Sequence, residues 1–311
     1  MAGETDLAAL LESMHPVLRE GEYVYALWPH GRPLEGGVEA AVREAEGLTV
    51  VLHRDEADRL GLEYDFVAAW ITLQVHSALE AVGLTAAVSS ALGAAGISCN
   101  VLAGFHHDHL LVPVADSAHA MEILTLLQRG VVLRSGMRAD REAILALTAA
   151  AFSINPVTGL PVDGEPGEVG LLKELFECEG YLPGLSIVAE LGGEIVGHVI
   201  STRGFVGDLP FLGLGPISVE PHLQRRGIGS ALLRETARRA AASGEAGIAL
   251  LGSTDYYPRF GYVPGTTVGV QPPEPAWGAH FQVLPLPGMP DAGTSDGGLG
   301  TFRYAEPFQR L

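Results

Sequence analysis

Residues 215–233 read GPISVEPHLQRRGIGSALL, and no other stretch of this chain carries more structural information. Apolar residues up to Val219 predict a strand, and the apolar spacing that follows predicts a long helix over Ile228–Ala242. Gly227 and Gly229 stand where this helix begins, and there the first backbone N–H groups lack a partner and the helix dipole favours an anion. The sequence therefore predicts a strand, a glycine turn and a helix that together cradle a phosphate.

The spacing of these glycines differs from the two commonest nucleotide motifs. The Lys-Ser/Thr pair of a P-loop is missing, and a dinucleotide fingerprint would need one further glycine. Arg225 and Arg226 bring positive charge to the turn, and the glycines leave the backbone open to a pyrophosphate. An ordinary helix N-terminus with solvated arginines is the alternative that these residues alone leave open.

The whole chain of 311 residues is acidic, with 37 Asp and Glu against 19 Lys and Arg and a net charge of −18. This charge disfavours a nucleic-acid partner, and a single lysine, Lys173, leaves no polybasic anchor for a membrane surface. The first ten residues, MAGETDLAAL, carry acids where a signal peptide needs positive charge. We therefore expect a cytoplasmic protein.

One stretch, residues 81–105, contains no charged side chain and has the length of a membrane span. Serines and Asn100 interrupt it, and its pattern changes at Gly96 from a run typical of helix to one typical of strand. We therefore expect a buried helix, a glycine stop and a buried strand.

The chain divides at about residue 130, where an amphipathic run ends and the apolar run Val131-Val132-Leu133 begins. We expect one domain over 1–130 and a second over 131–311. The expected helices are 6–14, 37–44, 85–95, 116–127, 139–151, 168–178 and 228–242. The expected strands are 23–28, 48–53, 70–75, 97–103, 109–113, 131–134, 186–191, 194–202, 212–219 and 247–251. In the first domain this order predicts an antiparallel sheet with helices on one face.

Two motifs of the second domain resemble the GNAT acetyltransferase superfamily, and most of all its YhbS-like branch. QRRGIG, residues 224–229, matches the acyl-coenzyme A signature Q/R-x-x-G-x-G/A. YYPRFGY, residues 256–262, has a tyrosine four residues before a Gly-aromatic pair, as the second hallmark of that superfamily does. The resemblance covers residues 131–311 and implies a GNAT acyltransferase fold, which is a mixed, mostly antiparallel sheet with flanking helices.

The resemblance also implies acetyl-CoA as co-substrate. The strand that ends at Val219 would pair with the pantetheine arm, a backbone N–H near Val219 would polarise the thioester carbonyl, and the turn amides would bind the pyrophosphate. The residues expected to bind the coenzyme are Ile217, Ser218, Val219, Gln224, Arg225, Arg226, Gly227, Ile228, Gly229 and Ser230.

Tyr257 would protonate the departing thiolate, because a phenol with a pKa near 10 is protonated at pH 7. Core packing beside Phe260 is the other reading of this side chain, and Tyr256 could take the role instead. Glu220, at the end of the strand, is the candidate base, and a solvated strand end is equally compatible with it.

The acceptor would be a primary amine on a small molecule or a protein lysine. Acids of the loop 153–170 and the helix after it would favour a cationic amine, although such a run is also typical of a solvated helix face. These acids are Asp163, Glu165, Glu168, Glu174, Glu177 and Glu179.

In the first domain three stretches closely resemble small ACT domains. They are REAEGLTVVL (43–52), VHSALEAVGLTAAVSSAL (75–92) and GISCNVLAGFHHDHLLVPV (96–114). The resemblance covers about residues 4–128 and implies a ferredoxin-type α/β sandwich that senses an amino acid and pairs into a homodimer. Residues 83–85 and 98–100 are candidates to hold that amino acid, while capping by Thr85 and a turn bond by Asn100 explain them equally well.

His106-His107-Asp108-His109 places His107 and His109 on one face of a strand. Two ligands are too few without His76 or His53, so we expect no metal. Cys99 and Cys178 lie too far apart in sequence to indicate a metal or redox pair.

Together these features predict a mixed α+β protein that is an acetyl-CoA-dependent N-acetyltransferase. It would transfer an acetyl group to a primary amine by direct attack in a ternary complex, under regulation by an amino acid at the ACT-like domain. Neither cysteine falls in a motif that favours a covalent intermediate. The alternative is a non-catalytic sensor of acyl-CoA and amino acids, or an interaction module.

Overall fold

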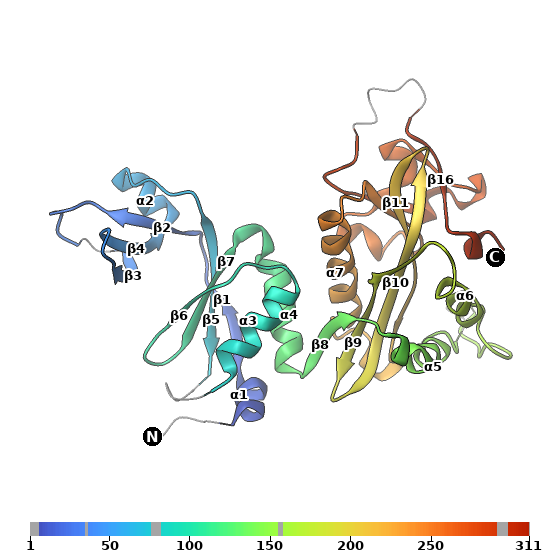
Figure 1. Ribbon diagram of the computed structural model, residues 1–311, viewed down its shortest axis with the longest axis horizontal. Coiled ribbons are helices and arrows are strands. Elements are labelled where there is room, and N and C mark those ends of the chain that lie inside the picture. The colour runs from blue at the N-terminus through green and yellow to red at the C-terminus, as the bar shows by residue number, and fades with distance from the viewer. Residues whose placement is uncertain (1–5, 35–36, 76–81, 155–157, 291–297, 311) are drawn as a thin grey trace. The chain divides into compact units, whose positions relative to one another are not determined.

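The structure is a computed structural model that describes residues 6–34, 37–75, 82–154, 158–290 and 298–310 (Figure 1). The chain forms two compact units, residues 1–130 and residues 131–311. Each unit has its own sheet and its own buried apolar clusters.

The N-terminal unit is a sheet with helices. Its helices are α1 (Leu7–Ser13), α2 (Arg54–Leu60), α3 (Leu84–Ala94) and α4 (Ser117–Gln128). Its strands are β1 (His15–Leu18), β2 (Tyr23–Trp28), β3 (Val38–Arg43), β4 (Leu48–His53), β5 (Val67–Gln74), β6 (Asn100–Ala103) and β7 (Asp108–Pro113). The strand order is β3-β4-β2-β5-β7-β6, with β1 on β5, and the pairings of the described strands are antiparallel.

Strand β5 joins the two halves of this sheet. Its first residues, Val67 and Ala68, pair with β2, and the strand then pairs with β7 on one side and with β1 on the other. The first half of the sheet consists of β2, β3 and β4, and the second half consists of β5, β6 and β7. Strand β1 precedes all of these strands in the sequence but pairs in the second half. Helices α1, α3 and α4 pack against one another beside this second half (Figure 1).

The helix expected over 37–44 is wrong, because this segment is the strand β3, paired with β4. Its alanines and glutamates favour a helix locally, but the hairpin with β4 supplies partners for its backbone, and sheet context outweighs propensity. The expected helix, glycine stop and strand are found as α3, Gly96 with φ 65° and β6. However, β6 is an edge strand and is only partly buried. The helices of the described residues are all too short or too polar to cross a membrane.

Within its described residues, the C-terminal unit has a nine-stranded mixed sheet and three α-helices. The helices are α5 (Arg141–Ala151), α6 (Gly167–Leu175) and α7 (Ile228–Ala242). The strands are β8 (Val131–Ser135), β9 (Tyr181–Leu191), β10 (Glu194–Val206), β11 (Leu209–Val219), β12 (Gly247–Leu251), β13 (Val263–Pro264), β14 (Val270–Gln271), β15 (Phe281–Pro285) and β16 (Gly300–Arg303). Their order is β13-β15-β12-β11-β10-β16-β14, with β9 on β10 and β8 on β9.

The helices of this unit cover opposite faces of the sheet. A Cβ on Gly197 of β10 would lie 2.8 Å from Ile228, so this face meets α7. The next residue, His198, points to the other face, where α5 and α6 pack on Val188 and Ile200. His198 is fully buried, its Nε2 lies 3.0 Å from Ser186 Oγ, and burial lowers the pKa of this imidazole to about 3.

Strands β11 and β12 separate after a short parallel contact. They pair over residues 211–213 and 247–249, whereas β11 continues to Val219 and keeps its antiparallel pairing with β10. Within the described residues, the other edge of β11 therefore has no strand partner beyond Gly213. The backbone of residues 214–219 is thus open to a ligand beside the start of α7.

Candidate active site

A cavity of about 420 Å³ lies at the end of β11, the start of α7 and the segment after β12. Most of the residues that the sequence predicts for the coenzyme line it. They are Ile217, Val219, Gln224, Arg225, Gly227, Gly229 and Ser230. Two further lining residues, Tyr256 and Arg259, come from the tyrosine motif.

The turn before α7 is shaped by backbone conformation. Gly227 is the N-cap of the 15-residue helix and has φ 91°, a value that side chains disfavour. Arg225 also has a positive φ, 61°, and Gln224 Nε2 donates a hydrogen bond of 3.2 Å to the Val219 carbonyl oxygen. The unpaired N–H groups of the first helical turn thus begin at residues that line the cavity, where they can bind an anion.

Three predicted coenzyme residues do not line the cavity. The Ser218 hydroxyl lies 3.0 Å from Thr148 Oγ1 of α5, because Ser218 points to the opposite face of the sheet from Ile217 and Val219. Ile228 is buried beside Gly197, and Arg226 is exposed outside the lining. Any contact of Ser218 or Ile228 with a ligand in this cavity would involve the backbone.

The two adjacent tyrosines have different surroundings. Tyr256 lines the cavity, and a Cβ on Gly229 would lie 3.3 Å from its hydroxyl oxygen. Tyr257, by contrast, is outside the lining, packs against Gly252, and has its ring centroid 5.7 Å from that of Tyr262. Burial raises the pKa of Tyr257 to about 12. A group with this pKa keeps its proton throughout the neutral and mildly alkaline range.

Glu220, the predicted base, lies outside the cavity lining. Its backbone N–H donates to the Val196 carbonyl oxygen at 2.9 Å, and its carboxylate lies 3.3 Å from His222 Nδ1. The side chain is partly exposed. Any proton transfer from a substrate in the cavity to Glu220 would therefore need an intervening water.

Arg259 is the lining residue that the sequence reasoning missed. Its guanidinium carbon lies 4.0 Å from the centroid of the Tyr256 ring, and its Nε donates to the Tyr256 carbonyl oxygen at 3.0 Å. A positive residue between the aromatic residues of YYPRFGY was the available signal, because arginine stacks on aromatic faces.

The acids expected to attract an amine are in part already paired. Glu165 accepts a hydrogen bond of 2.9 Å from Lys173, and Glu177 pairs with Arg141. Asp163, Glu168, Glu174 and Glu179 lie on the same loop and helix segment, and residues 155–157 of that loop lie outside the described residues.

Two candidate histidine ligands of the N-terminal unit have local partners. His109 Nδ1 lies 3.1 Å from Thr72 Oγ1, and His107 Nδ1 lies 3.4 Å from the Val75 carbonyl oxygen. Thr85 and Asn100 are exposed, in the first turn of α3 and at the start of β6. Across the described ranges, which leave out His76, no group of three or more His, Cys, Asp and Glu side chains could hold a metal ion.

Family comparisons agree with this geometry. The acetyltransferase (GNAT) domain profile matches residues 183–264, which include β11, the turn, α7 and the tyrosine motif. One ACT domain profile matches residues 2–69 and another matches residues 66–125. The chain therefore carries ACT domains in its N-terminal unit and a GNAT acetyltransferase domain in its C-terminal unit. Both resemblances are confirmed, but two ACT matches cover the region where the sequence predicted one.

Individual relatives can be compared in the same way. The uncharacterized N-acetyltransferase YjhQ of Escherichia coli K12 is 36% identical over 101 residues, which are 31% of this chain and 56% of YjhQ. The chain thus spans about half the length of this curated relative. A GNAT family acetyltransferase from Brucella melitensis, solved with acetyl-CoA, is 30% identical, with 58% of this chain and 99% of that chain covered and a TM-score of 0.44.

Two further solved structures complete the comparison. YhbS of Escherichia coli, a GNAT family N-acetyltransferase solved with CoA, is 25% identical, with 58% of this chain and 93% of that chain covered and a TM-score of 0.49. A protein of unknown function from Vibrio cholerae, described as a possible transport protein, is 40% identical. The match covers 39% of this chain and 95% of that chain, with a TM-score of 0.34.

Proposed function

We propose that the C-terminal unit is an acetyl-CoA-dependent N-acetyltransferase that moves the acetyl group to a primary amine by direct attack in a ternary complex. The observation that carries this proposal is the cavity in which the N-terminus of α7 meets the unpaired edge of β11. Coenzyme A has an anionic pyrophosphate and an amide-rich arm. The N-terminus of α7 suits the pyrophosphate, and the open edge of β11 beside it suits the amides of the arm. The GNAT match over 183–264 and the Brucella melitensis relative solved with acetyl-CoA support the same co-substrate.

In this proposal the backbone does most of the binding. The amides from Arg225 to Ser230 hold the pyrophosphate, with Gly227 and Gly229 keeping the approach free of Cβ atoms. The edge of β11 from Ile217 to Val219 pairs with the pantetheine amides. A backbone N–H near Val219 then polarises the thioester carbonyl and stabilises the oxyanion that forms when the amine attacks.

The attack of the amine on the thioester carbon forms the new C–N bond and breaks the C–S bond. The departing thiolate then needs a proton, and Tyr257 is the first candidate donor, since its raised pKa of about 12 keeps its hydroxyl protonated. Tyr256, whose hydroxyl lies near Gly229, is the other candidate acid. The proton lost by the amine leaves through water, and Glu220 is its candidate acceptor.

A turnover assay tests this proposal and separates the two tyrosines. Free thiol is measured while acetyl-CoA is mixed with a panel of small amines and lysine peptides, using the wild type, Tyr257→Phe and Tyr256→Phe. We expect turnover with at least one amine and a loss of kcat in Tyr257→Phe with an unchanged Kd for acetyl-CoA. If acetyl-CoA binds but no amine is acetylated, the unit is a sensor of acyl-CoA and the catalytic proposal is wrong.

For the N-terminal unit we propose an amino-acid effector and assembly into a homodimer. The two ACT domain matches support this assignment. Regulation requires an effector with different affinities for two states of the enzyme. Each standard amino acid is therefore added in turn, with turnover and thermal stability as readouts, and light scattering gives the mass of the assembly. If none of the amino acids shifts either readout, the regulatory role is wrong, and a monomer mass excludes the dimer.

A further inference from the structure

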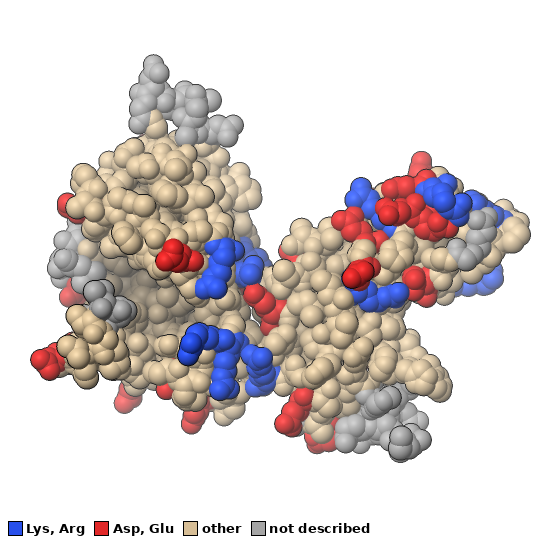
Figure 2. Space-filling model, turned by 180° about the vertical axis from the view of Figure 1, so that it is seen from behind, with Lys and Arg blue, Asp and Glu red and all other residues tan. Residues whose placement is uncertain are grey.

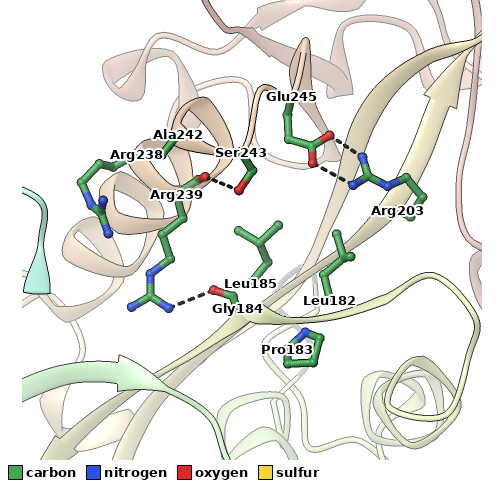
Figure 3. Close-up of a pocket in the computed structure, with 10 residues that line it drawn as sticks. All are labelled: Leu182, Pro183, Gly184, Leu185, Arg203, Arg238, Arg239, Ala242, Ser243 and Glu245. Carbon is green, nitrogen blue, oxygen red and sulfur yellow. Dashed lines mark hydrogen bonds and ion pairs between the residues drawn. The ribbon is translucent and has the colours of Figure 1, made fainter.

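Arginines line two cavities that the described residues of the C-terminal unit form, and these arginines have different partners. A second cavity, of about 470 Å³, lies between the start of β9 and the end of α7 (Figure 3). In it Arg203 forms a two-pronged ion pair with Glu245, which is 3% exposed. Arg238 and Arg239 both bind Glu235, which is 2% exposed. The positive charge of this cavity is therefore largely neutralised by buried carboxylates.

The arginines of the candidate coenzyme cavity have no such compensation. Within the residues that the structure describes, neither Arg225 nor Arg259 has a carboxylate partner. Figure 2 shows basic side chains gathered in a few clusters on the C-terminal unit, although the net charge of the chain is −18. Two unneutralised guanidinium groups at a cavity attract an anion, because charge that the protein leaves unpaired is available to a ligand.

Arg259 is also held in a fixed place. Its guanidinium lies on the ring of Tyr256, 4.0 Å from the centroid, and 5.3 Å from the centroid of Phe260. Only its Nε has a hydrogen-bond partner among the described residues, the Tyr256 carbonyl oxygen, which leaves the terminal nitrogens free. The Tyr256 hydroxyl in turn lies beside Gly229 in the first turn of α7. The ring therefore sets the place of Arg259 relative to the helix N-terminus.

We propose that Arg259 is a phosphate-binding residue of this cavity and that Tyr256 positions it. The inference rests on the proposed use of acetyl-CoA. Arg225 and the N-terminus of α7 line the cavity, and the planar fork of Arg259, from the segment after β12, offers a second anchor for phosphate oxygens. Coenzyme A carries phosphate in the pyrophosphate bridge and on the ribose 3′ carbon. A second anchor gives the site selectivity for the phosphorylated coenzyme over simpler thioesters.

Calorimetric titration with CoA and with 3′-dephospho-CoA tests the assignment. We expect Arg259→Gln to weaken CoA binding about tenfold or more, because a hydrogen-bonded charge pair with phosphate is lost. Arg259→Lys keeps the charge without the fork and should lose less. Arg138→Gln is the matched control, because Arg138 is exposed, has no carboxylate partner in the described residues and does not line the cavity.

The two ligands identify the phosphate. If Arg259→Gln weakens CoA but not 3′-dephospho-CoA, Arg259 binds the 3′-phosphate. An equal loss for both ligands assigns Arg259 to the pyrophosphate. If Arg259→Gln binds CoA as tightly as the Arg138→Gln control does, the assignment is wrong. If the wild type binds neither ligand, the proposed use of acetyl-CoA is wrong. This result is distinct from a failure of the Arg259 assignment, in which the wild type still binds CoA.

The positioning role of Tyr256 has its own test. Tyr256→Phe keeps the ring and should leave the Kd for CoA unchanged, whereas Tyr256→Leu should lose most of what Arg259→Gln loses. The double variant Tyr256→Leu/Arg259→Gln should then be no weaker than Arg259→Gln alone. Additive losses would show that Tyr256 binds the coenzyme by itself and would overturn its positioning role. Circular dichroism of each variant verifies that the fold is retained.

Discussion

Replacing Gly227 by alanine has two separate expected effects, one on the stability of the fold and one on the affinity for acetyl-CoA. Gly227 is the N-cap of α7 with φ 91°, and a Cβ there would meet no atom within 4 Å beyond its chain neighbours. The folding cost is therefore that of the backbone conformation alone, about 1–2 kcal/mol. For a unit of this size it lowers Tm by about 2–8 °C. The new methyl group also stands at the phosphate cradle, where losing one charged hydrogen bond would weaken acetyl-CoA about tenfold or more.

The other end of the same helix offers a matched control. Gly244 has φ 76°, and a Cβ there would also meet nothing within 4 Å, but Gly244 does not line the cavity. Gly244→Ala should thus lose a similar amount of stability and keep its affinity. Scanning calorimetry measures the first quantity, and titration with acetyl-CoA measures the second. Equal affinities of Gly227→Ala and Gly244→Ala would refute the reasoning that the amides of α7 hold the pyrophosphate.

Three other predictions concern Tyr257, His198 and the Arg203–Glu245 ion pair. If Tyr257 is the acid, Tyr257→Phe lowers kcat about 10²-fold or more. In the wild type the pKa of Tyr257, about 12, keeps the phenol protonated, so the pH–rate profile should show no loss of kcat between pH 8 and 10. The pKa of His198 is about 3 in the fold and about 6.5 in the unfolded chain, so stability falls below pH 6.5 by about 1.4 kcal/mol per pH unit. Urea unfolding at several pH values should show a shallower decline in His198→Gln. Arg203→Met leaves the buried Glu245 unpaired and should lower the free energy of unfolding by about 3–5 kcal/mol, measured by chemical denaturation. The double variant Arg203→Met/Glu245→Gln should recover part of this loss.

The sequence predicted α7, β2, β4 and β12 to the residue, because each has a clear apolar period between glycine or polar boundaries. It missed α2, which is only seven residues long, although Gly61 with φ 66° marks its end. It also missed β1, where Pro16 argues against a strand. Strands of this kind form because a neighbouring strand offers partners, and a local pattern does not contain that information.

At the candidate site, Gly227 was predictable because the positive φ at the start of a helix favours glycine. The choice between Tyr256 and Tyr257 was not. Tyr256 is the N-cap of the short 3₁₀ helix and Tyr257 is its first residue, and packing against Gly252 keeps the ring of Tyr257 outside the cavity lining. Arg259 was missed for a related reason, because its neighbours in space matter more than its neighbours in sequence.

The pairing of β1 with β5 has a consequence for how the N-terminal unit is made. His15 pairs with Gln74 and Leu18 with Ile71, so β1 must wait for more than fifty further residues of synthesis before its partner strand exists. Such distant pairing slows folding. A nascent chain that ends near residue 66, where the two ACT matches meet, would expose β1 as an unpaired edge open to aggregation. We therefore expect the two halves of this unit to fold together and neither half to be stable when expressed alone.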